Sequence, residues 1–476
     1  TETTTVSTTT EVSVQSIEEQ TENNPVEVYN SNYAVYAVSS SDEYEQPEGD
    51  GTQKNPYQIS NSSQLFWFAN QVNNKSGKAS INAVLTKDIV VNDNLLDSLK
   101  FDEYGKVTNE ADFKKWTPIG NSSREYQGTF DGQNHTISGL YFNDDSIDYV
   151  GLFGYKYYGA IKNVGVIDSY FKGEDYVGGI CGSMNYGRIE NSYNTGTVSG
   201  SLDVGGVCGY NYLKCKITNS YNAGSVSGSN RYAGGVCGYK SDTSTIENSY
   251  NTGSVSGNQV VGGVCGKNIN IITNVYNTGT VNGNSTVGGV CGHNDGGAIE
   301  NNYNTGSVSG SENVGSICGY SYYGTIKNSY YNNSISNKAV GSNKEGTFDI
   351  TGKTPEQFKS GEVAYSLGGI YGQEIGKDKS PILNGKTVYQ NTVYLGCCEK
   401  YQGDITYVYS NKEANPVYSG NHNFENGICT GCGTYELIEP DLKDGYYQIE
   451  NAHHLYWFAK QVNSGNTKIN AVLTAN

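Results

Sequence analysis

Thiols and an imidazole near the C-terminal end are the residues of this chain best placed for chemistry. Cys429 and Cys432 form Cys-Thr-Gly-Cys, a spacing at which one tight turn can present both thiolates to the same metal ion. His422 precedes them, and the adjacent Cys397 and Cys398 lie farther upstream. These residues predict one structural zinc site with the tetrahedral ligands Cys397, His422, Cys429 and Cys432, and with Cys398 as an alternative ligand.

The pair Cys397-Cys398 departs from a zinc-ribbon pattern, in which a second Cys-x-x-Cys is expected. Two adjacent cysteines rarely ligate one metal well, so one of them would be a spectator. Disulfide bonds between the two cysteine pairs are the competing interpretation.

The histidines do not have the spacing of a catalytic metal site. A metallopeptidase helix needs His-Glu-x-x-His, in which two imidazoles one turn apart hold zinc and the glutamate acts as general base. None of the five histidines has that spacing: His135, His293, His422, His453 and His454. The adjacent pair His453-His454 is expected on a solvated helix face.

Six further cysteines recur with a regular period and must be positioned by a repeated element. They stand 26 to 29 residues apart in variants of Val-Gly-Gly-Val-Cys-Gly, as Cys181, Cys208, Cys237, Cys265, Cys291 and Cys318. An earlier copy, from Val150 to Gly154, has Phe153 at the same place. A second signature, Asn-Ser-Tyr-Asn-Thr-Gly, keeps the same period. The chain is therefore a repeat protein.

Each repeat is divided by Gly, Asn-Thr-Gly and Ser-Gly into three segments of β-branched, aromatic and small residues, all too short for a helix. Three strands and three turns in about 27 residues predict one coil of an all-β parallel β-helix, or β-solenoid. Successive coils would stack about 4.8 Å apart and share a core. A β-propeller is disfavoured because its blades need four strands and about 40 residues.

A position that accepts both cysteine and Phe153 is an apolar core position, so the six cysteines are expected inside the coils as free thiols. Disulfides between coils are the alternative. In-register side chains run parallel, however, and keep the Cβ atoms farther apart than the roughly 3.8 Å that a disulfide prefers. Cys215 lies outside the column and is expected in a turn.

A second column contains the tyrosines Tyr193, Tyr221, Tyr250, Tyr276, Tyr303 and Tyr330. Stacked aromatic side chains stabilise parallel sheets, which predicts a structural ladder. If the ring faces were exposed, the column and its neighbouring asparagines would instead form a ribbon able to stack on sugars or to meet a protein partner.

Helices are expected to cover the open ends of the solenoid, where the core and the strand edges would otherwise face water. Residues 57–74 predict a strand and then an amphipathic helix capped by Asn61 or Ser62. At the other end, residues 354–369 predict a second capping helix that begins at a Thr-Pro pair and ends at glycine. Residues 447–474 nearly repeat the first capping sequence, which predicts the start of a second solenoid.

Composition adds limits on partners. The net charge of −17 is uneven, because residues 1–50 carry eleven acidic residues and no Lys or Arg. The chain has only three arginines and no basic stripe, so nucleic acid is not expected as a partner. No apolar run approaches 18 residues, so no membrane insertion is expected in this segment.

Together these features predict five regions: a disordered, acidic, Thr-rich stalk (1–50), a capped parallel β-solenoid (51–345), a C-terminal capping helix and strand (346–395), a Cys/His linker (396–438) and the start of a second solenoid (439–476).

The repeated motifs also resemble a known family. The V-G-G-[VI]-C-G copies, WTPIG, GTFDGQNHTISGL, LFWFANQVN and TPEQFKSGEVAYSLGG are similar to the GLUG-motif proteins of bacterial cell surfaces. That family includes the non-catalytic repeat region of IgA1-specific metallopeptidases and many surface proteins of Gram-positive bacteria. HNFENGICTGCG similarly resembles a zinc-ribbon-like segment between such modules. The resemblance implies an extracellular, cell-wall-associated protein and names no ligand.

The expected function is therefore a non-catalytic structural or adhesive module, a stalk or adhesin repeat of a surface protein. Its expected partners are glycans or surface proteins of a host or of microbes. The alternative is a carbohydrate-active parallel β-helix enzyme, a lyase or glycoside hydrolase, which would need clustered carboxylates in one groove. The residues predict no such cluster: Asp131 lies in a GTFDG turn, and Asp144, Asp145 and Asp148 lie in a polar loop expected to be solvated.

Overall fold

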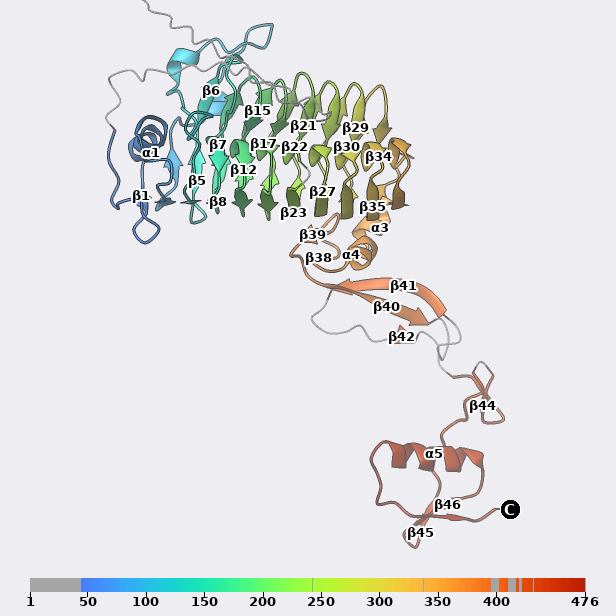
Figure 1. Ribbon diagram of the computed structural model, residues 1–476. Coiled ribbons are helices and arrows are strands. Elements are labelled where there is room, and N and C mark those ends of the chain that lie inside the picture. The colour runs from blue at the N-terminus through green and yellow to red at the C-terminus, as the bar shows by residue number, and fades with distance from the viewer. Residues whose placement is uncertain are drawn as a thin grey trace, which may run out of the picture.

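The structure, a computed structural model, describes residues 44–241, 243–336, 338–394, 402–409, 417–418, 422–430 and 432–475. A long stack of parallel strands occupies most of the described chain, and a hairpin region and a C-terminal helix–strand unit follow it (Figure 1). The predicted all-β parallel β-solenoid is therefore confirmed.

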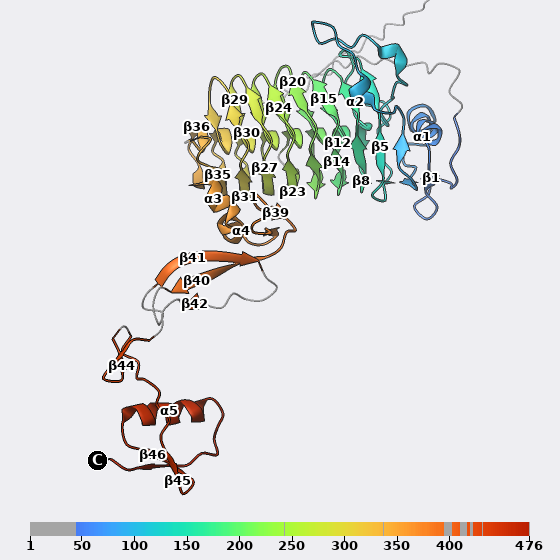
Figure 2. The same cartoon turned by 180° about the vertical axis from the view of Figure 1, so that it is seen from behind.

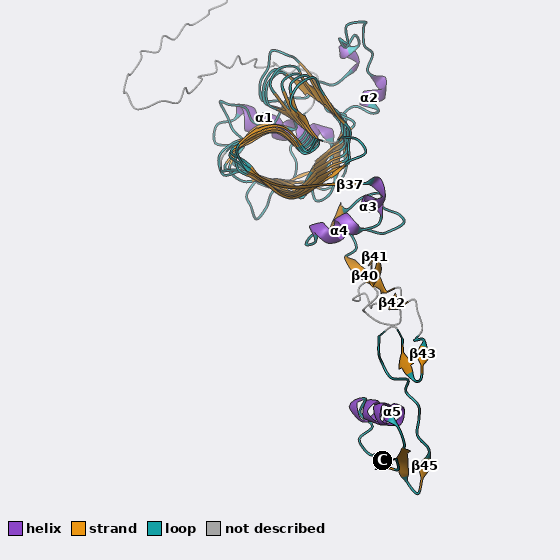
Figure 3. Ribbon diagram, turned by 90° about the vertical axis from the view of Figure 1, so that its right-hand side faces the viewer, coloured by secondary structure: helices purple, strands orange, loops and turns teal. Residues whose placement is uncertain are grey.

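One coil illustrates the repeat. It runs through five strands: β12 (Cys181–Asn185), β13 (Arg188–Glu190), β14 (Tyr193–Asn194), β15 (Thr197–Gly200) and β16 (Val204–Gly205). Each strand pairs in parallel with its equivalent in the next coil, so that Cys181 lies opposite Cys208 and Val204 opposite Ala233. Viewed along the stack, the strands superimpose into continuous walls (Figure 3).

The walls form four sheets instead of the three that the punctuation predicted. Strands β13 and β14 belong to the largest sheet, which begins at β1 (Tyr57–Ile59) and β2 (Ala83–Leu85) and ends at β35 (Thr325–Asn332) and β37 (Thr347–Lys353). The other three sheets contain, respectively, β12, β15 and β16. They extend from β7 (Phe153–Tyr157) to β36 (Val340–Lys344), from β6 (Tyr141–Asn143) to β32 (Val308–Ser309), and from β11 (Val177–Gly178) to β33 (Val314–Gly315).

The extra strand arises within Val-Gly-Gly-Val-Cys-Gly, which forms two strands and not one. At Gly206 an added Cβ would lie 2.2 Å from the carbonyl oxygen of Gly235 in the next coil. No side chain fits at that separation, so only glycine lets the backbone cross between the two sheets. The sequence signal for this bend is the Gly-Gly pair within each copy of the motif.

A ladder of fully buried asparagines runs through the interior of the stack. Each side-chain Nδ2 donates to the Oδ1 of the next asparagine at 2.8–2.9 Å and also to the carbonyl of the glycine two residues later. Buried amides are tolerated only when they are paired, and here the repetition itself supplies the pairs. The ladder consists of Asn194, Asn222, Asn251, Asn277 and Asn304.

The N-terminal end is closed by α1 (Ser62–Asn74), as predicted. Asn61 is the N-cap, and its side chain accepts a hydrogen bond from the Gln64 amide at 2.9 Å. Leu65, Phe68 and Val72 are buried against the first coils. The helix lies at the blue end of the stack in Figure 1 and is seen from behind in Figure 2.

Residues just before the predicted boundary at residue 51 contact the N-terminal cap. The Glu45 carboxylate accepts hydrogen bonds from Asn61 and Gln64 at 2.9 and 2.8 Å, so residues 44–50 belong with the cap. The rest of the predicted stalk, residues 1–43, lies outside the described part of the chain.

After the last coil, residues 355–367 form two short helices, α3 (Pro355–Lys359) and α4 (Glu362–Leu367), divided at Gly361, whose φ is 91°. The predicted Thr354 cap is present as a full capping box with Gln357. The helices do not lie across the end of the stack. They pack on its side, against the tyrosine column (Figure 3).

The remaining described elements follow the solenoid. They are β38 (Tyr371–Gly372), β39 (Ile382–Leu383), β40 (Val388–Tyr394), β41 (Gln402–Tyr409), β42 (Val417–Tyr418), β43 (Phe424–Glu425), β44 (Ile428–Cys429), β45 (Leu442–Lys443), β46 (Tyr446–Ile449), α5 (Ala452–Asn463) and β47 (Ala471–Leu473). The longest described helix has 13 residues. None of the described helices combines the length and the hydropathy of a membrane span.

Candidate functional site

The cysteine column is buried inside the stack as thiols, as expected. All six side chains are inaccessible to solvent, and none forms a disulfide. The thiols instead donate to backbone carbonyls two residues later, for example from Cys265 to Lys267 at 3.1 Å. Burial raises the pKa of Cys208, Cys237 and Cys291 well above the ordinary value. Thiolate chemistry is therefore suppressed here.

Cys215 does lie beside a turn, but it is also buried, and its thiol donates to the Leu213 carbonyl at 3.3 Å. Burial raises its pKa to about 12.

Thiol labelling should separate these cysteines from the linker. In the native protein a maleimide reagent is expected to leave Cys208, Cys237 and Cys265 unmodified, because the reagent cannot reach them and the thiolate is rare. Denaturant should expose all of them. Mass spectrometry of labelled peptides measures this, with the partly buried Cys432 of chelator-treated protein as the accessible comparison. Rapid native labelling of the three column residues would contradict the buried assignment.

The tyrosine column is a structural ladder whose ring faces contact one another. From Tyr193 to Tyr303, consecutive rings lie 4.6–5.0 Å apart with interplanar angles of 2–5°. The inner rings therefore present only edges and hydroxyls to solvent, so sugars cannot stack on their faces. This geometry overturns the alternative of an exposed sugar-stacking ribbon and confirms the ladder.

Part of the ladder is also covered. Phe358 from α3 and Tyr371 from β38 lie 5.7 and 6.0 Å from the Tyr303 ring. The Tyr371 hydroxyl donates to the Val275 carbonyl at 2.9 Å, and the Tyr303 hydroxyl donates to the Pro381 carbonyl. This cover leaves the edges of Tyr193, Tyr221 and Tyr250 partly accessible.

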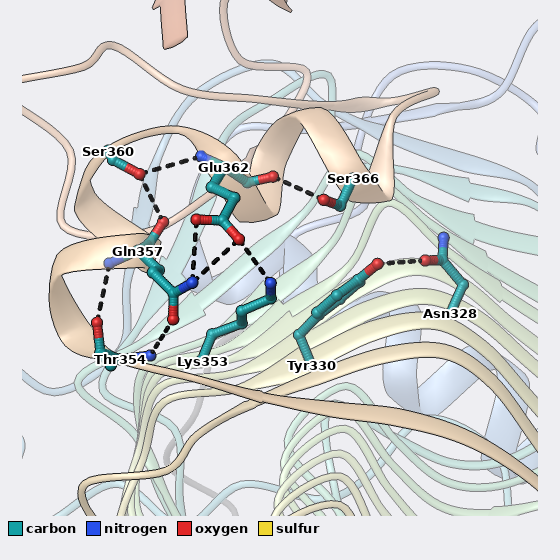
Figure 4. A network of polar contacts seen from close by, with 8 residues as sticks. All are labelled: Asn328, Tyr330, Lys353, Thr354, Gln357, Ser360, Glu362 and Ser366. Carbon is teal, nitrogen blue, oxygen red and sulfur yellow. Dashed lines mark hydrogen bonds and ion pairs between the residues drawn. The ribbon is translucent and has the colours of Figure 1, made fainter. Parts of the chain in front are cut away.

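A polar network holds the two helices in place (Figure 4). The Glu362 carboxylate accepts from the Lys353 ammonium at 2.5 Å and from the Gln357 amide at 3.1 Å. Gln357 also accepts from the Thr354 amide, which links the ion pair to the capping box. Nearby, the Tyr330 hydroxyl donates to Asn328. The arrangement positions helices and offers no reacting group.

Sequence reasoning missed a column of carboxylates on successive coils. Asp148 and Asp175 each lie two residues before the valine of the Val-Gly pair in their copies of the repeat. Asp203 lies one residue before the equivalent valine of the next copy. Aligning the copies on Val-Gly would have shown the column. Asp148 accepts from the Asp175 amide at 3.2 Å, and Asp175 accepts from the Leu202 amide at 3.0 Å.

These carboxyls are partly or fully buried, and for Asp148 this differs from the expected solvated loop. Burial, followed by the charge of Asp175, raises the pKa of Asp148 to about 6 and that of Asp203 to about 8. Asp203 is only 7% exposed. Its carboxyl interacts electrostatically with the phenols of Tyr210, Tyr232 and Tyr239. Two of the three carboxylates thus cap backbone amides of the next coil, which is a structural role.

Asp131 also has a structural setting. Burial opposes its ionisation, but hydrogen bonds from Asn163 and Gln133 and the Lys162 ammonium at 3.0 Å outweigh burial and lower its pKa. Asp144 accepts from Ser146, and Asp145 pairs with Lys172 at 3.1 Å on the surface.

The linker brings together three of the predicted metal ligands. The short hairpin of β43 and β44 places Cys429 at its end, and Gly433 turns the chain back with a φ of 74°. One ligand atom from each of His422, Cys429 and Cys432 lies within 4.8 Å of the others. The Cys432 sulfur is 3.4 Å from Nδ1 of His422.

This donor set fits a zinc ion in chemistry, and binding would require only a small closing of its spacing. Ligand atoms about 2.0–2.3 Å from a tetrahedral zinc lie less than about 4 Å from one another. Hydrogen bonding to Cys429, and then to Cys432, raises the pKa of His422. The other predicted ligands, Cys397 and Cys398, lie outside the described residues.

The His453-His454 pair does not simply face solvent. His454 Nδ1 accepts from the Glu450 amide at 3.3 Å, as the Gln64 side chain accepts from Ser60 at 2.8 Å in the first cap. His453 Nδ1 lies 3.1 Å from the Glu436 carbonyl of the linker. Both imidazoles therefore fix the N-terminal turn of α5 locally.

Comparisons with known proteins agree with the repeat. The family model described as the GLUG motif matches residues 173–199 and 200–227. Halomucin from Haloquadratum walsbyi is 28% identical over 171 residues, which cover 36% of this chain and 2% of halomucin. A "putative Gly-rich membrane protein" from Evansella cellulosilytica is 29% identical over 164 residues, 33% of this chain and 17% of that protein. The chain thus spans a small part of these relatives.

Among solved structures, a "putative immunoglobulin A1 protease" from Bacteroides ovatus aligns with a TM-score of 0.44 and 20% identity, over 71% of this chain and 95% of that one. The two matched copies each span one coil, from the turn before β11 through β15 and from there to β20 (Val226–Gly228). The chain therefore carries two matched copies of the GLUG motif, in successive coils of the stack.

Proposed function

We propose that this chain is a non-catalytic structural or adhesive module of an extracellular surface protein. The observation that carries the proposal is the uninterrupted parallel pairing from β1 to β37, reinforced by the buried asparagine and tyrosine ladders. Such a stack resists bending because every coil is hydrogen-bonded to its neighbours. A rigid body of this kind suits a spacer or stalk that projects from a cell wall, with glycans or surface proteins as partners.

The carboxylate column favours a second candidate, a carbohydrate-active enzyme. Against it, the Asp148 and Asp175 carboxylates are occupied with backbone amides, and Asp203 is buried. A glycosidase needs two carboxyls facing one another across a substrate at about 5–10 Å, both accessible. The non-catalytic role is therefore the better-supported one.

Incubation with plant, mucin and microbial polysaccharides tests this directly. No reducing or unsaturated ends are expected to be released, because the carboxylates of the column are bonded to backbone amides or buried. Weak binding that strengthens when the module is presented in several copies is compatible with adhesion. Reproducible turnover that disappears in Asp131→Asn or Asp203→Asn would overturn the proposal in favour of the enzyme.

A structural zinc ion in the linker is the second part of the proposal. His422, Cys429 and Cys432 would hold it, with Cys397 or Cys398 as the fourth ligand. The metal would supply a crosslink that fixes the hairpin, because small loop-rich segments lack the core to fold alone. Disulfides between the cysteine pairs remain the competing arrangement.

Metal analysis of protein purified without chelator is expected to find about one zinc per chain. Cys432→Ser should lose the metal, because three remaining donors bind far more weakly, and His135→Ala serves as the matched control at an unrelated histidine. Zinc far below one per chain, together with absent thiols at these positions, would favour disulfides.

A further inference from the structure

Two turns of the solenoid carry the same Tyr-Tyr-Gly sequence at exposed positions. Residues 157–159 link β7 to β8 (Ala160–Lys162), and residues 322–324 link β34 (Cys318–Tyr322) to β35. The two rings of each pair meet edge to face, with centroids 4.5 and 4.6 Å apart. Tyr158 and Tyr323 are 50% and 47% exposed. These rings therefore keep part of a face open to solvent, unlike the inner rings of the tyrosine column.

The second tyrosine of each pair has a strained backbone. The φ of Tyr158 is 61° and that of Tyr323 is 50°, in the left-handed region that bulky residues rarely adopt. Gly296 has the equivalent place after β30 (Cys291–Asp295), because Asp295 pairs in register with Tyr322, and its φ is 69°. A Cβ added at Gly296 would meet nothing within 4 Å, so the turn itself needs no side chain. Tyrosine at this place adds backbone strain that burial does not offset, which indicates a role in binding.

The first pair is part of a larger group of residues, Tyr157, Tyr158, Tyr186 and Lys214, which we call the first aromatic corner. Tyr186 occupies the same turn one coil later, also with a positive φ, of 53°. Its ring lies 5.4 Å from the Tyr158 ring at an angle of 34°, and 5.7 Å from the Tyr157 ring at 70°. The Lys214 ammonium, from the turn of the following coil, lies 5.9 Å from the Tyr186 ring. Three rings at different angles and one cation therefore form one continuous surface.

The cation of this corner is available to a ligand. Lys214 is exposed and forms no ion pair with any residue that the structure describes. Its neighbours Arg188 and Lys216 differ, because they pair with Glu190 and Glu247 at 3.1 and 2.8 Å. An anionic group would therefore be stabilised at Lys214, whereas a cationic ligand would be repelled.

The second pair has a cation in the same relation to its rings. The Lys344 ammonium, from the next coil, lies 5.1 Å from the Tyr322 ring and 5.4 Å from the Tyr323 ring. Lys344 is exposed and has no ion pair within the described part of the chain. Tyr322, Tyr323 and Lys344 form the second aromatic corner. The exposed Glu345 beside Lys344 makes this corner less attractive to anions than the first.

The two corners lie along the same edge of the stack. Strands β7 and β34 belong to one sheet and are six coils apart, near opposite ends of the solenoid (Figure 1). At the spacing of paired strands, the corners are about 29 Å apart. One extended polymer can therefore contact both corners, whereas a short ligand occupies only one.

We propose that the two aromatic corners bind an acidic glycan chain that runs along the stack. The apolar C–H faces of its sugar rings pack on Tyr158, Tyr186 and Tyr323. Its carboxylates or phosphates pair with Lys214 and Lys344. This site rests on the proposed adhesive function and specifies the glycan partner of that function.

Titration calorimetry on the full chain tests the proposal with three probes. They are an oligogalacturonate long enough to reach both corners, the same chain with its carboxyl groups reduced to alcohols, and poly-glutamate. Oligogalacturonate is expected to bind saturably. The reduced chain lacks the anion and poly-glutamate lacks the sugar rings, so each should bind about tenfold more weakly or worse. A phosphomannan tests phosphate as the anion, and saturable binding of either acidic glycan supports the proposal.

Glycine variants separate binding from stability. Tyr158→Gly combined with Tyr186→Gly should weaken binding by about tenfold or more, because both rings are lost. The urea midpoint should stay unchanged or rise, because glycine relieves the strain at positive φ. Tyr158→Asn, with a residue that tolerates this backbone, should also weaken binding. Tyr104→Ala is the control, because Tyr104 is 86% exposed and lies outside both corners.

Two further comparisons test charge and length. Lys214→Ala should remove most of the preference for the acidic chain over the reduced one, and Lys214→Arg should retain it. A digalacturonate cannot reach both corners, so it should bind more weakly than the long chain. Tyr323→Gly should weaken binding of the long chain and leave binding of the digalacturonate unchanged, because the first corner remains intact.

Three results would overturn the inference: no saturable binding of an acidic glycan, equal binding by the double glycine variant, or equal binding of the reduced chain. Poly-glutamate that binds as tightly as oligogalacturonate would also overturn it, in favour of an acidic protein segment as the partner. Release of reducing ends is measured separately. A failure of binding therefore leaves the non-catalytic role standing, and turnover would overturn that role whether or not these corners bind the glycan.

Discussion

Replacing Asn277 with alanine is expected to destabilise the solenoid by about 4 kcal/mol. The Asn277 side chain is fully buried, accepts from Asn251 at 2.8 Å, and donates to Asn304 and to the Gly279 carbonyl at 2.8 Å. Alanine leaves three buried polar groups each without one partner, and each such loss costs about 1–3 kcal/mol. A Cβ added at Gly263 would lie 2.5 Å from the Asn277 side-chain amide carbon, so the backbone of the same repeat packs closely on this side chain.

Asn282→Ala is the matched control from the same coil. Asn282 is exposed, on a strand of the same stack, so its loss should change stability by less than about 0.5 kcal/mol. Urea unfolding followed by circular dichroism compares both variants with the parent. If Asn277→Ala costs no more than Asn282→Ala, the ladder contributes nothing to stability and the buried-amide argument is wrong.

Asp203→Asn is expected to stabilise the protein increasingly as the pH rises. Burial and the nearby Asp175 raise the pKa of Asp203 from 3.8 to about 8 in the folded chain. Between about pH 4 and pH 8 the unfolded chain loses the proton while the folded chain keeps it, so the parent loses stability across that window. The variant has no proton to lose and is spared this loss, which amounts to several kcal/mol, at most about 6.

The measurement is the free energy of unfolding of the parent and the variant between about pH 2 and pH 9. Their difference should grow up to about pH 8 and then level off, whatever constant offset the amide introduces. Asp131→Asn is the control of opposite sign. The pKa of Asp131 is lowered, so its carboxylate stabilises the fold above about pH 4, and that contribution is lost as the pH falls. A pH-independent difference for Asp203→Asn would refute the buried-acid assignment.

The repeat period was sufficient to predict the solenoid, the buried thiols and the N-terminal cap. Regular spacing of Cys181 and its equivalents requires each coil to place the same residue at the same point, so one inference applied to all copies. The helix caps could be predicted for a different reason, because capping signals are local. Asn61 and Thr354 each act within one helical turn, so sequence alone identified both helix starts.

Features that depend on how coils contact one another were not predictable. The number of sheets depends on glycines such as Gly206, where the backbone of the next coil leaves no room for a side chain. Only the three-dimensional structure shows this close approach. The pKa values of Asp148 and Asp203 depend on burial by residues from other coils. A polar residue in a loop gives no local signal of that burial.

The sequence by itself determined that this chain is a stack of parallel coils, because periodicity of 26 to 29 residues is a one-dimensional property that the stack preserves. It also placed His422, Cys429 and Cys432 among the predicted metal ligands, and these three come together in the linker because their spacing is short. Only the tertiary structure decided that the tyrosine rings stack face to face. It also decided that α3 and α4 cover the tyrosine ladder and not the end of the stack. Ring orientation and helix docking depend on side-chain packing between segments distant in sequence. Such packing leaves no regular pattern in the sequence from which it could be predicted.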